Sequence, residues 1–247
     1  MPELPEVETI RRQLSKKIVG KKIEGKEIKR VLRRAKLLII CFEDGSSLLI
    51  HLKLTGQLIF GGKPGPYTRH IFKFDDGSNL IFNDARKFGW FKKTKNKEET
   101  EKELSSFGPE ALEIDLKTFR NILKKRSGSK IKTLLMDQNF IAGIGNIYSD
   151  EILYRAKVHP LKKVNLLTDR EVVRIFKNIK KVLKEAIRRR GSSVEYYLDA
   201  FGKKGSYHKY HLVYQKEGQK CKRCQSIIKR IKIGSRSAHF CPGCQKL

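Results

Sequence analysis

The chain has 247 residues, with 55 Lys and Arg against 26 Asp and Glu, which gives a formal net charge of +29. An excess of this size predicts binding to a polyanion, because cationic side chains that neutralise phosphates release counterions. The hydrophobic fraction of 39% predicts a folded protein and excludes an isolated basic tail. Charge alone would also fit a ribosomal protein or a protein of a membrane surface.

No segment is long enough to span a bilayer. The longest apolar run is LLIICF, from Leu37 to Phe42, far below the roughly 20 residues of a membrane helix. The first residues lack the basic and apolar regions of a signal peptide. We therefore expect a cytoplasmic protein, in which five cysteines indicate metal binding rather than disulfides.

The first segment, from Pro2 to Gly20, is predicted to be a helix. Pro5 suits the first helical turn, where its missing N–H costs nothing, and Gly20 can end the helix. Apolar residues recur three and four positions apart, as expected for one buried stripe: Val7, Ile10, Leu14 and Ile18.

Residues 22–93 have the pattern of antiparallel strands. Short runs such as SSLLIHLKL and HIFKF are rich in branched and aromatic residues, and Asp44-Gly45 and Asp76-Gly77 are hairpin signals. We expect a sandwich or a barrel. The charged stretch that follows, Lys92 to Glu103, is predicted to be a solvated helix face or a loop.

Residues 117–190 are predicted to be helical. Thr168 and Glu171 match a capping box at the start of the last helix, and Gly191 can end it. A glycine-rich loop and paired cysteines follow from Phe201 onward. The fold class is therefore α+β and multidomain, with predicted domains at residues 1–112, 113–200 and 201–247.

The C-terminal cysteines have the spacing of a zinc site, C-x2-C-x16-C-x2-C. Each close pair can supply two thiolates from a tight turn, and the intervening residues suit a hairpin that closes a tetrahedral site. Four thiolates leave no open coordination position, so we expect one structural Zn²⁺ that contributes folding free energy. Its ligands would be Cys221, Cys224, Cys241 and Cys244.

The acidic leader MPELPE contrasts with the basic chain that follows it. Removal of Met1 would expose Pro2 as a secondary amine, which can attack a sugar C1′ and form an iminium. Glu3 lies beside that amine and could transfer a proton, while Glu6, one helical turn further on, could orient the terminus. The alternative is a capped helix whose acids favour the positive end of the helix dipole.

The leader MPELPEVETIRR resembles the N-terminus of formamidopyrimidine-DNA glycosylases. Further segments follow in that family's order and extend the resemblance over essentially the whole chain: RRAK (33–36), HLKLTG (51–56), DARKFGW (84–90), LLMDQNFIAGIGNIYSDEIL (134–153) and the four-cysteine tail. The resemblance implies a monomeric base-excision repair enzyme that acts on damaged duplex DNA, within the nucleoid, without a membrane or a small-molecule cofactor. It would remove oxidised purines and then cut the abasic strand by β,δ-elimination.

The resemblance also implies roles for catalytic residues. Pro2 would be the nucleophile and Glu3 the general acid, with Glu6 supporting the site. Lys36 matches the lysine assigned to β-elimination, and Arg236 matches the finger arginine linked to δ-elimination. A solubilising lysine at a strand edge is the alternative for Lys36.

Extrusion of the target nucleotide leaves a gap in the base stack that the protein must fill. By resemblance, Leu54, Arg86 and Phe88 fill it, with Arg86 on the orphaned cytosine and Phe88 as a wedge. Leu54 stands where relatives carry methionine, so we expect filling to persist with less adaptability. Leu54 and Phe88 could instead be packing residues.

Other residues are expected to contact DNA. Glycines and a helix N-terminus in IAGIGNIYSDE would let backbone approach a phosphate, with Asn146 contacting it by its side chain. The remaining expected contacts are His51, His70, Lys130, Lys132 and Tyr214. His70 could equally be a packed strand residue.

Two departures from the family pattern stand out. A basic position upstream of the helical motif is replaced by Gly128. The segment between the first helix and RRAK is short, so we expect a trimmed sandwich. The loop from Phe201 to Tyr214 matches the segment that closes over a flipped base.

Three other functions remain open at this point. One is a glycosylase of the endonuclease VIII type, which prefers oxidised pyrimidines, although LPEVETI and the RKF loop favour purines. Another is a catalytically silent, zinc-containing DNA-binding protein. A basic ribosome-associated protein is more remote.

Overall fold

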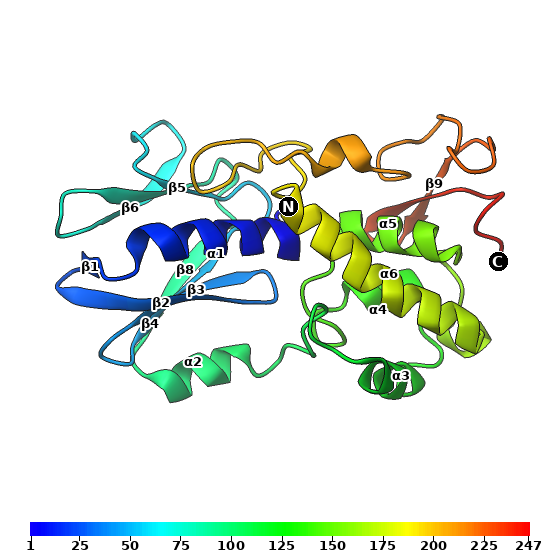
Figure 1. Cartoon of the computed structure of the whole chain (residues 1–247), viewed down its shortest axis with the longest axis horizontal. Helices are drawn as coiled ribbons and strands as arrows, with labels where there is room; N and C mark the ends of the chain where they lie inside the picture. The colour runs from blue at the N-terminus through cyan, green and yellow to red at the C-terminus, as the bar shows by residue number, and fades with distance from the viewer. The chain divides into compact units, whose positions relative to one another are not determined.

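The computed structural model describes residues 1–247 (Figure 1). The chain forms two compact units, each built from two stretches of sequence. Unit 1 comprises Met1–Ser106 and Ala186–His208, and unit 2 comprises Phe107–Glu185 and Lys209–Leu247. The three predicted domains, with ends at residues 112 and 200, stay a prediction.

Unit 1 contains two helices and eight strands. Their bounds are α1 Leu4–Ile18, β1 Lys22–Ile23, β2 Lys26–Arg34, β3 Leu37–Phe42, β4 Ser47–His51, β5 Gln57–Phe60, β6 Thr68–Lys73, β7 Asn79–Asn83, β8 Trp90–Thr94 and α2 Lys97–Leu104. The predicted first helix is confirmed. The charged stretch is confirmed as a largely solvated helix, α2, preceded by the end of β8.

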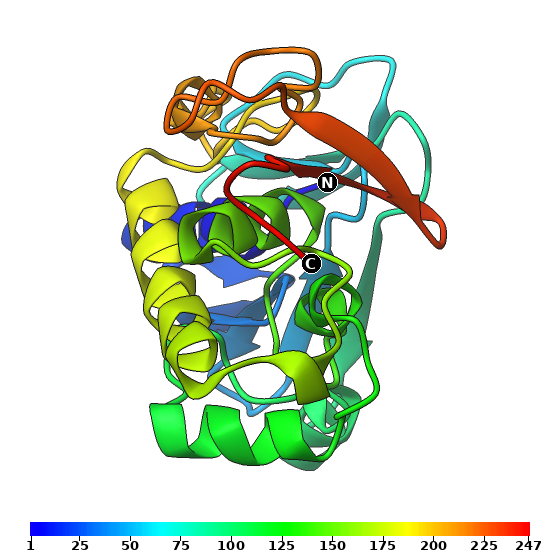
Figure 2. The same ribbon diagram turned by 90° about the vertical axis from the view of Figure 1, so that its right-hand side faces the viewer.

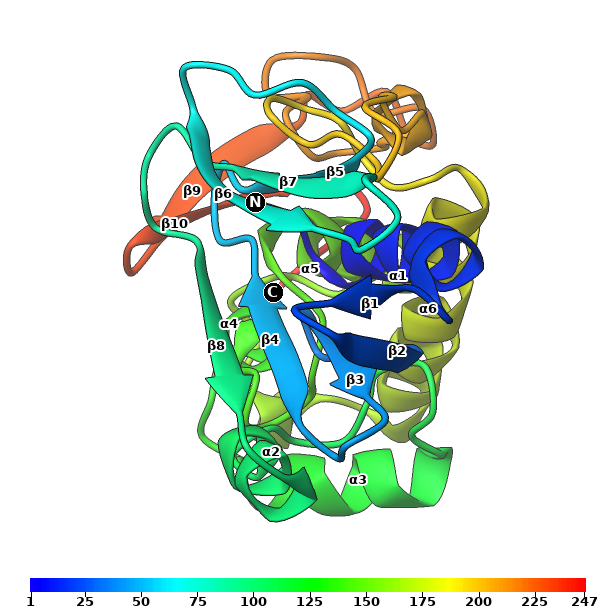
Figure 3. The same ribbon diagram turned by 90° about the vertical axis from the view of Figure 1, so that its left-hand side faces the viewer.

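Two antiparallel sheets make up the body of unit 1. One has the strand order β1-β2-β3-β4-β8 and the other β5-β7-β6. Figure 3 shows α1 running alongside both sheets. The stripe predicted from periodicity points into one core that α1 shares with the inner faces of both sheets, so the expected antiparallel sandwich is present.

The unbroken apolar run LLIICF is explained by burial on both faces of β3. Leu38 and Ile40 belong to the core beneath α1. Leu37 and Ile39 pack on the opposite face, where Leu104 of α2 covers them. A strand that is buried on both faces has no need of polar alternation.

Unit 2 is mainly helical and carries the C-terminal hairpin (Figure 2). Its elements are α3 Leu116–Lys124, α4 Ile131–Met136, α5 Asn146–Ala156, η1 Val164–Leu166, most of α6 Asp169–Arg188, β9 Lys229–Ile233 and β10 Arg236–Phe240. The short helix η2, Tyr207–Tyr210, lies where the chain passes between the two units. No helix of the chain is long and apolar enough to cross a membrane.

The ends of α6 follow the sequence signals. The Thr168 backbone N–H donates to Glu171 Oε2 over 2.8 Å, and the Glu171 N–H donates back to Thr168 Oγ1 over 3.2 Å. Gly191 follows the helix with φ +77° and donates its N–H to Ala186. The capping box and the terminating glycine are therefore confirmed.

Candidate active site and DNA interface

The N-terminus of α1 is held by its own carboxylates. Pro2 is buried, and Glu3 and Glu6 are 2% and 1% exposed. The Glu3 backbone N–H donates to Glu6 Oε2 over 2.8 Å, as part of a capping box that opens the helix. This contact holds the backbone immediately after Pro2, and the supporting role expected of Glu6 stays a prediction.

The second oxygen of Glu6 binds a segment far along the chain. The Ser192 backbone N–H donates to Glu6 Oε1 over 2.7 Å, and the Tyr197 hydroxyl donates to the Glu6 carbonyl over 3.4 Å. A Cβ at Gly191 would lie 2.7 Å from Glu6 Oε1. Gly191 therefore serves two purposes, since it ends α6 and leaves room for the carboxylate.

Lys36 lies in the turn between β2 and β3 and is only 6% exposed. Arg33 shapes that turn: its Nη1 donates to the Ala35 carbonyl over 2.9 Å, and its Nε donates to Glu8 Oε2 over 3.2 Å. Arg33 and Glu8 thus tie the lysine's turn to α1. Sequence reasoning missed both, although Arg33 belongs to the RRAK motif.

His51 ends β4 close to this lysine. Burial, together with the charges of Lys53 and Lys36, lowers its pKa to about 4. Its Nδ1 accepts the Lys53 backbone N–H over 3.0 Å. The ring is therefore neutral at pH 7, with its proton on Nε2, and can donate one hydrogen bond.

The residues expected to fill the base stack sit on two loops of unit 1. Phe88 is 52% exposed, and the Arg86 guanidinium lies 5.1 Å from the centre of its ring. Leu54 is half-buried. An exposed aromatic ring beside an arginine can stack against nucleic-acid bases.

His70 lies on β6 with an exposed side chain. Its ring centre is 4.4 Å from that of Phe72 and 4.7 Å from that of Phe91. Burial and then the charge of Lys93 lower its pKa. Both sequence-based interpretations, phosphate contact and packing, are compatible with this position, so the contact stays a prediction.

The glycine-rich motif of unit 2 ends at the N-terminus of α5. Gly145 is the N-cap residue and Asn146 is the first residue of the helix. The Asn146 Oδ1 is buried without a hydrogen-bond partner. Lys130 is exposed at the start of α4, where a phosphate can reach it.

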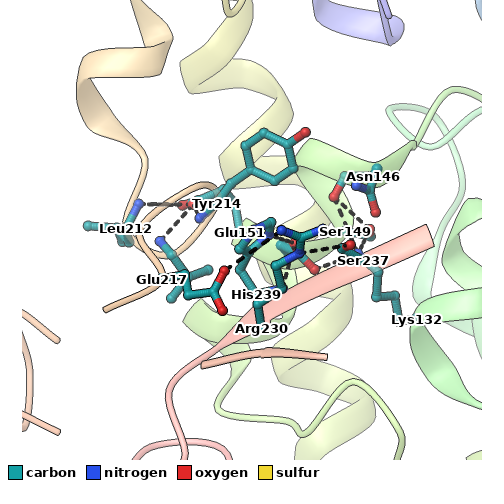
Figure 4. Close-up of polar contacts among 12 residues, drawn as sticks. Lys132, Asn146, Ser149, Glu151, Leu212, Tyr214, Glu217, Arg230, Ser237 and His239 are labelled. Atoms are coloured by element: carbon teal, nitrogen blue, oxygen red, sulfur yellow. Dashed lines mark hydrogen bonds and ion pairs between the residues drawn. The ribbon is translucent and has the colours of Figure 1, made fainter. Parts of the chain in front are cut away.

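Lys132 occupies a different environment from Lys130. It is 0% exposed, and its ammonium donates to Asp150 Oδ1, to Ser149 Oγ over 3.2 Å and to the Asn146 carbonyl over 3.4 Å (Figure 4). A direct phosphate contact, expected from the sequence, does not fit this position, because the ammonium would have to leave a buried carboxylate. Lys132 instead supports the backbone of the α5 N-terminus.

The same α5 turn holds two segments of the C-terminal region. The second oxygen of Asp150 accepts the His239 backbone N–H over 2.9 Å. Glu151 is fully buried and accepts the backbone N–H groups of Leu212, Val213 and Tyr214 at 2.9 to 3.0 Å (Figure 4). The adjacent acids thus fix β10 and the segment that carries Tyr214.

The two remaining candidates of unit 2 differ in their surroundings. Arg236 begins β10 and is exposed, with its backbone paired to Ile233. Tyr214 packs its ring edge-on against His239, with 5.1 Å between the ring centres. Arg236 is therefore accessible to solvent, Tyr214 is partly packed, and the DNA contacts of both stay predictions.

The four cysteines of the tail come together, with all their Sγ atoms within 4.8 Å of one another. Three of the Sγ–Sγ distances are 3.3, 3.4 and 3.9 Å. A tetrahedron with Zn–S bonds of about 2.3 Å has edges of about 3.8 Å. The thiolates therefore fit one structural Zn²⁺, as expected from their spacing.

The zinc site has a polar neighbour that the sequence did not reveal. The Tyr154 hydroxyl lies 3.1 Å from Cys221 Sγ. The Arg223 guanidinium lies 4.6 Å from the centre of the Tyr154 ring and donates to the Tyr154 carbonyl over 3.3 Å. A hydroxyl that donates to a metal-bound thiolate fixes its orientation.

Three family models match successive parts of the chain. The family model for the N-terminal domain of formamidopyrimidine-DNA glycosylase matches residues 1–30 and 21–91, and the model for its H2TH domain matches residues 107–197. A zinc-finger model, found in FPG and IleRS, matches residues 218–247. Together these matches define a DNA-repair protein with a helical DNA-binding module and a zinc finger.

Individual relatives match over the whole chain. The chain is 40% identical to a formamidopyrimidine-DNA glycosylase of Pelotomaculum thermopropionicum and 39% identical to one of Streptococcus pneumoniae, with at least 99% of each protein covered. A Lactococcus lactis Fpg in complex with abasic-site DNA is 36% identical, with a TM-score of 0.92 over 99% of this chain and 100% of that one. The chain belongs to the formamidopyrimidine-DNA glycosylase family.

Proposed function

We propose that the protein excises oxidised purines, such as 8-oxoguanine and formamidopyrimidines, from duplex DNA and then cuts the abasic strand. It is a bifunctional DNA glycosylase and AP lyase of base-excision repair. The observation that carries this function is the proline terminus, whose following backbone N–H is held by the buried Glu6 carboxylate. A related structure contains MutM with carbocyclic 8-oxo-G DNA, at 36% identity and a TM-score of 0.91. The protein would act as a monomer on cytoplasmic DNA, within the nucleoid.

The chemistry begins once Met1 has been removed. The secondary amine of Pro2 attacks C1′, the damaged base leaves, and the opened sugar stays bound as an iminium. Glu3 supplies a proton at the sugar, and Glu6 holds the backbone that aims the amine. Loss of a C2′ proton then expels the 3′ phosphate, and a second elimination expels the 5′ phosphate.

Other side chains bind and position the substrate. Arg236 and Lys130 are exposed cations for phosphates, and Asn146 presents a helix N-terminus to the strand. Lys36 contacts the damaged strand and assists β-elimination, while Arg236 assists δ-elimination. Leu54, Arg86 and Phe88 fill the stack that the extruded nucleotide leaves.

Borohydride trapping tests this function directly. Protein of mass-verified N-terminus is incubated with duplex DNA that carries 8-oxoguanine opposite cytosine, then reduced. We expect a covalent complex that maps to Pro2 and is absent from a Pro2→Leu variant that retains Met1. Trapping only with an oxidised pyrimidine would change the assigned substrate to that class of base. This alternative is worth testing because a Lactococcus lactis Fpg has been crystallised with DNA that contains an oxidised pyrimidine. Tight binding without trapping on any substrate, a bare abasic site included, would leave a silent DNA-binding protein.

A further inference from the structure

Two loops of unit 1 carry the side chains that we assign to stack filling, and strand pairing places them side by side. The Leu54 loop, residues 52–56, joins β4 to β5, and the Arg86 loop, residues 84–89, joins β7 to β8. His51 pairs with Trp90 at one end of both loops, and Gln57 pairs with Asn83 at the other. The loops therefore cross together from one sheet to the other.

Each loop has a tight backbone of its own. In the Leu54 loop, the Gly56 N–H donates to the Leu52 carbonyl over 2.9 Å, and a Cβ on Gly56 would lie 2.3 Å from that oxygen. In the Arg86 loop, Lys87 adopts φ +59°. These local features shape each loop but do not join one loop to the other.

Asp84 makes the connection. It is only 1% exposed, and its Oδ1 accepts the Thr55 hydroxyl of the Leu54 loop. The same oxygen accepts the Arg86 backbone N–H over 3.2 Å, and Oδ2 accepts the Gly89 N–H over 2.6 Å. Thr55 Oγ1 in turn accepts the Arg86 N–H over 3.1 Å. One carboxylate thus binds the residue after Leu54, the backbone of Arg86 and the far end of the Arg86 loop.

The packing around Asp84 leaves this arrangement little freedom. A Cβ on Gly89 would lie 2.7 Å from the Phe82 ring and 3.0 Å from Asp84 Oδ2. The Arg69 Nε donates to the Asp84 carbonyl over 2.9 Å. The contacts that hold the backbone of Arg86 and Phe88 thus come from the protein itself, and a backbone that is ordered before binding loses less entropy on association.

We propose that Asp84 is a positioning residue that sets Leu54, Arg86 and Phe88 in one arrangement before the nucleotide is extruded. This inference rests on the proposed function, because it assigns Asp84 a role only through those three side chains. Asp84 itself would touch neither DNA nor the reacting atoms. Its effect should therefore appear wherever a base stack must be opened and filled, and vanish where there is no stack.

The test compares duplex and single-stranded substrates. Asp84→Asn keeps the shape of the side chain but replaces one acceptor oxygen with a donor that faces an N–H or a hydroxyl. We expect its single-turnover excision of 8-oxoguanine from duplex DNA to fall about 10- to 100-fold, as for a small misplacement of binding groups. Borohydride trapping on a single-stranded abasic oligonucleotide should stay within about threefold of the parent value.

Two sets of controls separate positioning from general damage. Thr55→Val removes the hydroxyl that joins the loops and should reproduce the loss of excision from duplex DNA. Thr55→Ser keeps that hydroxyl and should excise at the parent rate. Asp44→Asn alters an exposed aspartate that also accepts a turn N–H, from Ser46 over 2.9 Å, and should leave both rates unchanged.

The outcomes are distinct. The inference is overturned if Asp84→Asn excises at the parent rate, if it loses both activities equally, or if Thr55→Ser falls as far as Thr55→Val. A parent protein that traps on neither substrate would instead overturn the proposed function.

Discussion

The Glu6 carboxylate accepts the Ser192 backbone N–H over 2.7 Å, although 186 positions separate the two residues. The other oxygen of the same carboxylate accepts the N–H of Glu3. The start of α1 and the residues after α6 therefore share one buried acceptor. Changes at either end of this link should disturb the N-terminus.

Gly191→Ala is expected to loosen that link. Its new Cβ would lie 2.7 Å from Glu6 Oε1, in addition to the strain of φ +77°. We expect a loss of about 2–4 kcal/mol of unfolding free energy, from backbone strain and a displaced buried carboxylate together, and weaker borohydride trapping. Urea unfolding provides the measurement.

Gly77→Ala is the matched control for backbone strain alone. Gly77 has φ +81°, and nothing lies within 4 Å of its would-be Cβ. It should cost only about 1–2 kcal/mol and leave trapping intact. Equal losses in the two variants would show that contact with Glu6 contributes nothing.

His51 should make the protein sensitive to acid. Its folded pKa is about 4, below the ordinary value of 6.5, so between these values the unfolded chain binds a proton that the folded chain does not. Stability therefore falls as pH drops through this window, and His51 should account for about 1–2 kcal/mol of the loss at pH 5. The difference in unfolding free energy between pH 7.5 and pH 5 should shrink by that amount in His51→Gln. If His51→Gln leaves this difference in unfolding free energy unchanged, the His51 ring must already be protonated in the folded protein at pH 5.

The Lys132–Asp150 pair should be costly to break. Both side chains are 0% exposed, so Asp150→Ala leaves a buried cation and is expected to cost about 3–5 kcal/mol. Lys132→Met in the same chain should recover part of that loss, which a double-mutant cycle measures. The exposed Lys97–Glu101 pair, with 3.5 Å between charged atoms, serves as control and should couple by less than about 1 kcal/mol. Comparable coupling in the two pairs would refute a structural role for Lys132.

Removal of zinc is expected to abolish DNA binding, because the hairpin that carries Arg236 is tethered by the four thiolates.

Tyr154→Phe should leave zinc bound at the site but speed its release to a colorimetric chelator, since partners of metal ligands typically contribute 10–100-fold in affinity. Retained DNA affinity after verified zinc loss would contradict the first expectation. Release at the parent rate would contradict the second.

Binding to duplex DNA should weaken steeply with salt, since the net charge is +29 and phosphate contacts release counterions. Arg236→Ala should lower the slope of log affinity against log salt by about one, for one lost contact. Lys97→Ala, on the mixed-charge helix α2, should leave the slope unchanged. A flat response in the parent would argue against a phosphate-binding surface.

Much of the fold was predictable because its signals are local. The stripe of α1, the capping box of α6 and the cysteine spacing each lie within a short stretch of sequence, and each is confirmed. The family motifs identified Pro2, Arg86 and Arg236 as candidates in the same way.

Contacts between distant residues were not predictable. Lys132 resembles a phosphate ligand in sequence, and nothing local indicates that Asp150 turns its ammonium inward. Asp84 stands in a recognised motif, but its partners are mostly backbone N–H groups, which carry no sequence signal. Glu6 could be assigned to the terminus, whereas its bond to Ser192 depends on how the chain returns.

The bond between Glu6 and Ser192 can form only late in synthesis of the chain, because Ser192 is made long after Glu6. A ribosome that adds 5–20 residues per second takes roughly 10–40 s to reach Ser192 after it has made the first helix. Throughout that interval Glu6 of α1 lacks its distal hydrogen-bond donor, the Ser192 N–H, and the first residues stay accessible to a peptidase that, on the proposed function, removes Met1. On the proposed function, the Pro2 amine can therefore be uncovered before Ser192 binds Glu6.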